Sequence, residues 1–173
     1  MNVLVLVEHD GGTIRDGTWP TITAARALGT VSLLVLGHDV GAVVPAAAAV
    51  PDVAGVHVAD DAALADGVAE AVAPVAAALM AEFDAFVAPA TSWGKNVAPR
   101  VAALLDVMQL SDVVGIDGPT TFRRPIYAGN AIATVETSDP KLVLTIRATA
   151  FERAACAEQR SAAKPTERRR HPY

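Results

Sequence analysis

Residues 85–100 read AFVAPATSWGKNVAPR, and they indicate how the chain is built. The first four residues are apolar and favour a buried strand. Thr91 or Ser92 suits the start of a helix, where a side-chain oxygen caps free backbone N–H groups, and Gly94 permits close packing. A helix is predicted over 95–105. The stretch is therefore a strand-turn-helix unit of the kind found in parallel α/β sheets.

The preceding sequence repeats this alternation of apolar strands and helices. Asp60-Asp61 is expected to start a long helix, and Pro74 is expected to kink that helix or divide it in two. Strands are predicted over 3–7, 31–36 and 53–58, and helices over 20–28, over 39–50 and from about 61 to 83.

The pattern changes after a further predicted strand at 109–116. The segments 121–127, 131–137 and 142–149 are β-rich, and they are predicted to form an antiparallel meander added to the parallel sheet. Gly129-Asn130 is expected to supply the positive φ angles of a turn. The fold class is thus α/β: an open, mostly parallel twisted sheet with helices on both faces and a C-terminal meander.

Composition limits the classes of function. Hydrophobic residues make up 52% of the 173 residues and charged residues 19%, enough for a core and too little charge for disorder. Residues 1–155 hold 9 Lys/Arg and 17 Asp/Glu, whereas 156–173 hold 5 and 2. An acidic globular part argues against nucleic acid as a partner. Arg168-Arg169-Arg170 could contact a phosphate, but a solvated chain end explains them better.

The sequence carries few signals for a membrane, a secretory route or a metal site. No apolar run is long enough to span a membrane, and no signal peptide is evident, so a cytoplasmic location is expected. Cys156 stands alone and predicts neither a disulfide nor a metal site. His9, His38, His57 and His171 lack ligand spacing, so no metal is expected.

Motifs for nucleotide binding and hydrolysis are incomplete. Gly94-Lys95 follows a strand, but Pro89 and Asn96 replace the Gly and Ser/Thr that a P-loop requires. Helix capping explains this turn better, and binding of an anion or contact with a partner protein remains an alternative. Gly-x-Ser-x-Gly and Gly-x-Gly-x-x-Gly are absent, and no catalytic residue is assigned. Acidic residues such as Asp10 and Asp61 are predicted to cap turns.

A second dense stretch, Arg123 to Asn130, combines adjacent arginines with an aromatic residue and a turn. Neighbouring residues of a strand face opposite ways, so one arginine can pair within the sheet while the other reaches a partner. Large amphipathic side chains are typical of interfaces, although ordinary packing is an equal alternative. The candidate interface residues are Trp93, Gly94, Lys95, Asn96, Arg100, Arg123, Arg124, Tyr127 and Asn130.

Three blocks together resemble the N-terminal domain of the alpha (large) subunit of electron-transfer flavoproteins. They are Pro89-Ala-Thr-Ser-Trp-Gly-Lys-Asn96, Pro99-Arg-Val-Ala-Ala-Leu-Leu-Asp106 and Arg124-Pro-Ile-Tyr-Ala-Gly-Asn-Ala131. The similarity runs from about residue 2 to Ala150. It implies a three-layer Rossmann-like domain of the adenine-nucleotide-binding α/β type.

The resemblance also implies a role. In this family the alpha domain pairs with a beta subunit that holds AMP, and FAD in a separate domain carries electrons from dehydrogenases to a quinone oxidoreductase. The expectation is an electron-carrier scaffold over 1–151 rather than an enzyme, with a charged, disordered tail at 152–173 and the FAD domain absent. This chain alone is expected to bind no FAD.

Two other functions remain as alternatives. One is a free-standing small adenine-nucleotide-binding α/β module, suggested by the sheet pattern and the turn before the helix at 95–105. The other is a hydrolase that relies on Lys95 or His9, which no residue spacing supports.

Overall fold

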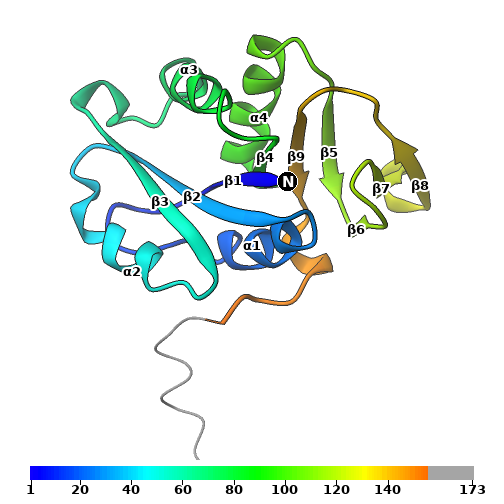
Figure 1. The fold of residues 1–173 in the computed structure, drawn as a ribbon, viewed down its shortest axis with the longest axis horizontal. Coiled ribbons are helices and arrows are strands. Elements are labelled where there is room, and N and C mark those ends of the chain that lie inside the picture. Colours follow the sequence, from blue (N-terminus) through cyan, green and yellow to red (C-terminus); the bar gives the residue numbers. More distant parts are fainter. Residues whose placement is uncertain (156–173) are drawn as a thin grey trace, which may run out of the picture.

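Six parallel strands form the central sheet, in the order β3-β2-β1-β4-β9-β5 (Figure 1). The structure is a computed structural model that describes residues 1–155. All five strand pairs of this sheet are parallel, so the predicted α/β class with a Rossmann-like sheet is confirmed. The strands are β1 (Asn2–Leu6), β2 (Thr30–Gly37), β3 (Val53–Asp60), β4 (Ala85–Pro89), β5 (Gln109–Val113) and β9 (Leu142–Ile146).

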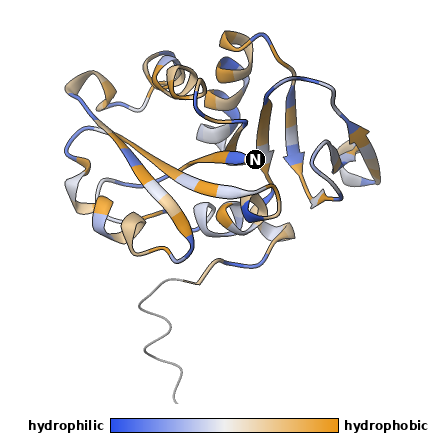
Figure 2. Cartoon of the chain, in the orientation of Figure 1, coloured by the Kyte–Doolittle hydropathy of each residue, from blue (hydrophilic) through white to orange (hydrophobic). Residues whose placement is uncertain are grey.

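Helices cover both faces of this sheet. Val3 and Val5 of β1 pack with α1 (Thr18–Arg26), and α2 (Val44–Ala48) lies on the same side. Leu4 and Leu6 pack on the opposite side with α3 (Ala69–Leu79) and α4 (Ser92–Leu104). Strands buried on both faces must be apolar at consecutive positions, and Figure 2 shows hydrophobic colouring along them.

The antiparallel part is a separate three-stranded sheet, β6-β7-β8, beside the edge strand β5 (Figure 1). Its strands are β6 (Gly115–Ile116), β7 (Thr121–Ile126) and β8 (Ala131–Glu136). The prediction that 142–149 belongs to this meander is wrong, because β9 lies between β4 and β5 and is parallel to both. All five β9 residues are buried, as expected of a parallel strand with neighbours on both sides. The single strand predicted at 109–116 is two strands: β5 belongs to the six-stranded sheet and β6 to the three-stranded one.

The predicted helix from 61 to 83 is interrupted, but not at Pro74. A 3₁₀ turn, Ala62–Leu64, is followed by Gly67 with φ +58°, and α3 then runs without a break through Pro74. Pro74 is exposed, so water can bond the Glu70 carbonyl that the proline leaves without a donor. The predicted helix at 39–50 is likewise two short pieces, a 3₁₀ turn at Val40–Ala42 and α2.

The last described residues return across α1. The Ala154 side chain is 3% exposed, and its N–H donates to the Trp19 carbonyl over 3.4 Å. Arg153 pairs with Asp16 at 2.6 Å, and its guanidinium lies 5.2 Å from the centre of the Trp19 ring. Packing thus continues to Ala154. Cys156, Arg168-Arg169-Arg170 and His171 lie outside the described residues.

Candidate functional site

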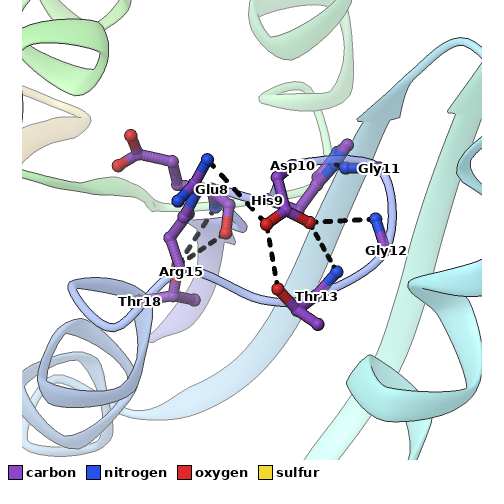
Figure 3. Close-up of polar contacts among 8 residues, drawn as sticks. All are labelled: Glu8, His9, Asp10, Gly11, Gly12, Thr13, Arg15 and Thr18. Carbon is purple, nitrogen blue, oxygen red and sulfur yellow. Dashed lines mark hydrogen bonds and ion pairs between the residues drawn. The ribbon is translucent and has the colours of Figure 1, made fainter.

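The loop between β1 and α1 is a polar turn closed by hydrogen bonds (Figure 3). Asp10 Oδ1 accepts hydrogen bonds from the backbone N–H groups of Gly12 at 3.0 Å and Thr13 at 2.7 Å. These bonds, with the Thr13 hydroxyl and the nearby Arg15, lower the pKa of Asp10 to about 2. The sequence-based prediction that Asp10 caps a turn is confirmed.

His9 is fixed by the same loop. Its Nε2 lies 3.0 Å from the Leu36 carbonyl oxygen, and its Nδ1 accepts the Gly11 N–H at 3.1 Å. These contacts assign the tautomer in which Nε2 carries the hydrogen and donates it to Leu36. Both ring nitrogens are therefore occupied, which argues against His9 as the base of a hydrolase.

A cleft of about 400 Å³ lies at the carboxyl ends of β1 and β2. Glu8, Asp10 and Asp66 are among the residues that line it, and Trp93 forms part of its wall. The Trp93 Nε1 donates to the Gly67 carbonyl at 2.6 Å, which holds the loop before α3 against the start of α4. Ligands of such sheets bind at this edge, so this cleft is a candidate binding site.

The start of α4 is closed by packing. Thr91 Oγ1 accepts the Gly94 N–H at 3.1 Å, as predicted for a helix cap. A Cβ added at Gly94 would lie 1.9 Å from the Pro89 carbonyl oxygen, so only glycine fits there. The capping explanation of this turn is therefore confirmed, and a P-loop is not formed.

A charged pair that the sequence did not reveal lies at the same edge of the sheet. Asp112 of β5 has φ +60°, at an irregularity in the pairing with β9, and its N–H donates to Thr145 Oγ1 at 2.8 Å. Arg147 binds both carboxylate oxygens of Asp112. Hydrogen bonding by this guanidinium lowers the pKa of Asp112. Lys95 and Arg147 border a second cavity of about 350 Å³ here.

Replacing Asp112 by asparagine should lower the free energy of unfolding by about 1–2 kcal/mol, the range for a partly exposed charged hydrogen bond. The folded-state pKa is depressed, so this stabilisation is present above the unfolded Asp value of about 3.9 and disappears as pH falls through the folded value. Urea denaturation from neutral to acidic pH measures it. Asp106→Asn is the control, because Asp106 also has positive φ, +55°. An equal loss in both variants would contradict the prediction.

The predicted interface residues come from different elements of the fold. Trp93, Gly94, Lys95 and Asn96 lie at the start of α4, whereas Arg123, Arg124, Tyr127 and Asn130 lie on or beside the hairpin of β7 and β8. One residue of each group, Lys95 and Arg124, is a cation that helps to lower the pKa of Asp112, after the larger effect of Arg147. Arg100 is separate and pairs with Glu70 of α3.

The two hairpin arginines are held within the domain. Arg123 Nε lies 3.0 Å from Asp117 Oδ2, and Arg124 Nη2 donates to Ser111 Oγ of β5 at 2.8 Å. Arg124 therefore fastens the small sheet to the large one. One arginine pairs with an acidic group, as predicted.

The tip of this hairpin exposes hydrophobic side chains. Tyr127 is 79% exposed, Ile132 is 56% exposed and Ile126 is 36% exposed. The turn has positive φ at Tyr127, Ala128 and Gly129, so the prediction is confirmed for Gly129 but wrong for Asn130, whose φ is −74°. Ile126 and Ile132 were not predicted as interface residues, because the alternation of side chains along a strand does not show which face of the hairpin packs against the rest of the domain.

A family model described as "Electron transfer flavoprotein domain" matches residues 3–171 of the chain. The chain belongs to the electron transfer flavoprotein family. The matched range extends past Ala150, where the resemblance noted in the sequence ends.

Curated relatives in this family are described as alpha subunits of electron transfer flavoproteins. The chain is 49% identical over 164 residues to "Electron transfer flavoprotein subunit alpha" of Pseudomonas aeruginosa, a match that covers 94% of this chain and 53% of the relative. It is 48% identical to the alpha subunit of Bradyrhizobium diazoefficiens, a match that covers 89% of this chain and 49% of the relative. It is 41% identical to the mitochondrial alpha subunit of Dictyostelium discoideum, a match that covers 87% of this chain and 45% of the relative. The chain thus spans about half the length of these relatives, and the matched half is the N-terminal domain region.

The family name implies a flavin, but the cleft at the carboxyl ends of β1 and β2 and the turn at Gly94 do not fit FAD. The pyrophosphate of FAD requires cations or free backbone N–H groups, whereas Glu8, Asp10 and Asp66 line this cleft. The turn where a phosphate would approach is closed by Gly94 against Pro89. Within residues 1–155, no group of three His, Cys, Asp or Glu side chains could hold a metal ion, and no helix is long and apolar enough to cross a membrane.

Proposed function

We propose that this chain is the scaffold domain of an electron-transfer flavoprotein alpha subunit and that it pairs with a beta subunit. The exposed tip of the β7–β8 hairpin carries the proposal. Tyr127 and Ile132 leave most of their surface to solvent and lie on one hairpin with Ile126, whereas the other large exposed apolar residues, Met108 and Leu104 among them, lie outside this hairpin. Exposed aromatic and branched side chains on a projecting hairpin are typical of protein interfaces.

In this proposal the domain positions a partner and does not itself react. FAD binds outside residues 1–155, AMP belongs to the beta subunit, and electrons pass from dehydrogenases to a quinone oxidoreductase. Three observations support a carrier scaffold: the acidic cleft, the closed turn at Gly94 and the fully bonded His9 ring. None of them offers an activated nucleophile or a cradle for phosphates.

Co-expression with the beta subunit from the same organism tests the pairing. We expect a one-to-one complex in size-exclusion chromatography at micromolar concentration. We also expect the chain purified alone to lack flavin absorbance, because neither the acidic cleft nor the closed turn at Gly94 fits the pyrophosphate of FAD. Two proteins that elute separately, each folded by circular dichroism, would contradict the pairing.

The alternative function is a free-standing module that binds an adenine nucleotide. The cleft at the carboxyl ends of β1 and β2 is in the usual place for such a ligand. Its carboxylates oppose the phosphates of AMP and ATP, so we favour the scaffold. Heat of binding in calorimetry with AMP, without complex formation, would favour the module instead.

A further inference from the structure

We infer that Arg124 is the positioning residue of the β7–β8 hairpin: its bond to Ser111 sets the angle at which the hairpin tip is presented to the beta subunit. The inference rests on the pairing proposed above and deepens it, because it names what holds the docking surface in place. It concerns the orientation of the tip, whereas the exposed side chains of the tip make the contact itself.

The half of the hairpin that carries the tip has few contacts with the rest of the domain. At the base, the Phe122 side chain is fully buried in the core, and the Arg123 carbonyl accepts the Val114 N–H at 2.8 Å. Within the part of the chain that the structure describes, no hydrogen bond joins residues 125–134 to anything outside the hairpin, and none of these residues belongs to a core cluster. Arg124 is therefore the last residue before the tip that bonds to the large sheet.

An irregularity in β5 supplies the acceptor for Arg124. The pairing of β5 with β9 shifts register at residues 111–112, where Asp112 has φ +60°. Such bulges bend a strand and redirect its side chains. The two residues here bind different partners, since Ser111 Oγ accepts a hydrogen bond from Arg124 Nη2 at 2.8 Å and Asp112 binds Arg147. The irregularity thus joins the hairpin to the large sheet through Arg124.

This bond is better suited to fix an angle than to stabilise the fold. Arg124 is half-buried, and its Nε is buried without a hydrogen-bond partner among the described residues. A guanidinium that is buried and only partly bonded loses in desolvation much of what its bonds return, so an apolar side chain can replace it at little cost in stability. A directional bond between two sheets still restricts their relative motion. A surface held in its bound orientation binds more tightly, because less freedom is lost on association.

Residual dipolar couplings of the backbone amides test the orientation in the chain alone. We expect a single alignment tensor to fit both sheets of the wild type. Arg124→Met keeps a long side chain and removes its donors, and the couplings of residues 125–134 should then shrink relative to those of the six-stranded sheet. Ser111→Ala should give the same loss, the double variant should add nothing to it, and Ser111→Thr, which keeps the hydroxyl, should behave as the wild type. Ser111→Ala also reports on the bond if Arg124→Met does not fold.

Two other arginines provide controls for these couplings. Arg26 of α1 is also half-buried, with Nη2 bonded to the Pro51 carbonyl and a buried Nε that has no partner among the described residues. Arg123 pairs with Asp117 inside the small sheet. Arg26→Met and Arg123→Met should leave the couplings of the hairpin unchanged. An equal loss in Arg26→Met, or no loss in both Arg124→Met and Ser111→Ala, would overturn the positioning role.

Calorimetry against the purified beta subunit tests the consequence for docking. Arg124→Met should bind about 10-fold more weakly than the wild type, whereas Arg26→Met should bind equally well, and the two variants should unfold at similar urea concentrations. A loosened hairpin that binds as tightly as the wild type would overturn the role of Arg124 in docking alone. A wild-type chain that does not bind the beta subunit would overturn the proposed pairing, and the docking role with it.

Discussion

Replacing Gly94 by alanine should lower the free energy of unfolding by about 3 kcal/mol or more. The substitution adds one methyl group in the first turn of α4, and its carbon would lie 1.9 Å from the Pro89 carbonyl oxygen and 3.1 Å from the Pro89 carbonyl carbon. Backbone atoms at the end of a buried strand cannot move aside as a side chain can. At an exposed helix position the same change would stabilise the protein by about 1 kcal/mol. The sign of the change in unfolding free energy therefore shows whether Gly94 lies against Pro89.

Two other glycines provide matched controls. A Cβ at Gly55 in β3 would meet no atom within 4 Å, and one at Gly17 would make contacts of 3.4 Å with Pro89 and 3.5 Å with Thr91. Urea denaturation should rank the alanine variants in the order of these distances, with Gly55→Ala nearest to the wild type. A Gly94→Ala protein as stable as Gly55→Ala would contradict the close approach.

The sequence predicted the layers of the fold because burial on both faces leaves a continuous apolar run, which β1, β2 and β4 display. It did not reveal that β9 returns to the interior of the large sheet, between β4 and β5. The run 142–146 is just as apolar, but the two β-rich segments before it suggested a meander, and strand order depends on contacts between distant residues. The break at Gly67 was missed because proline is the stronger local signal, although α3 accommodates Pro74 at an exposed position.

In the candidate sites, too, the sequence predicted local contacts and missed contacts between distant residues. The caps formed by Asp10 and Thr91 were predictable, because each bonds an N–H two or three residues away. The Asp112–Arg147 pair joins residues 35 apart, and the Trp93–Gly67 bond joins residues 26 apart. Nothing in either local sequence marks such a partner. Local rules therefore predicted the turns, and only the folded chain shows which turns meet.

The hairpin tip should dominate pairing with the beta subunit. Changing Tyr127 to asparagine and Ile132 to threonine together should weaken the complex about 100-fold, or about 2.7 kcal/mol, because large exposed anchors carry most of the binding energy of an interface. Asparagine tolerates the left-handed backbone of Tyr127, φ +51°, and threonine keeps the strand preference of Ile132. The double variant should therefore stay folded. Isothermal titration calorimetry against the purified beta subunit measures the loss.

A matched control separates the tip from exposed apolar surface in general. Val58 of β3 is 47% exposed and lies on the opposite edge strand of the six-stranded sheet, far in strand order from β5 and the hairpin. Val58→Thr makes the same kind of change as Ile132→Thr, so any general effect of reduced hydrophobicity should appear in both. If both variants bind alike, or if the double variant binds as tightly as the wild type, the hairpin tip is not the docking surface. Selective loss in the double variant, with unfolding free energies that match, means that contact at the tip rather than stability holds the complex together.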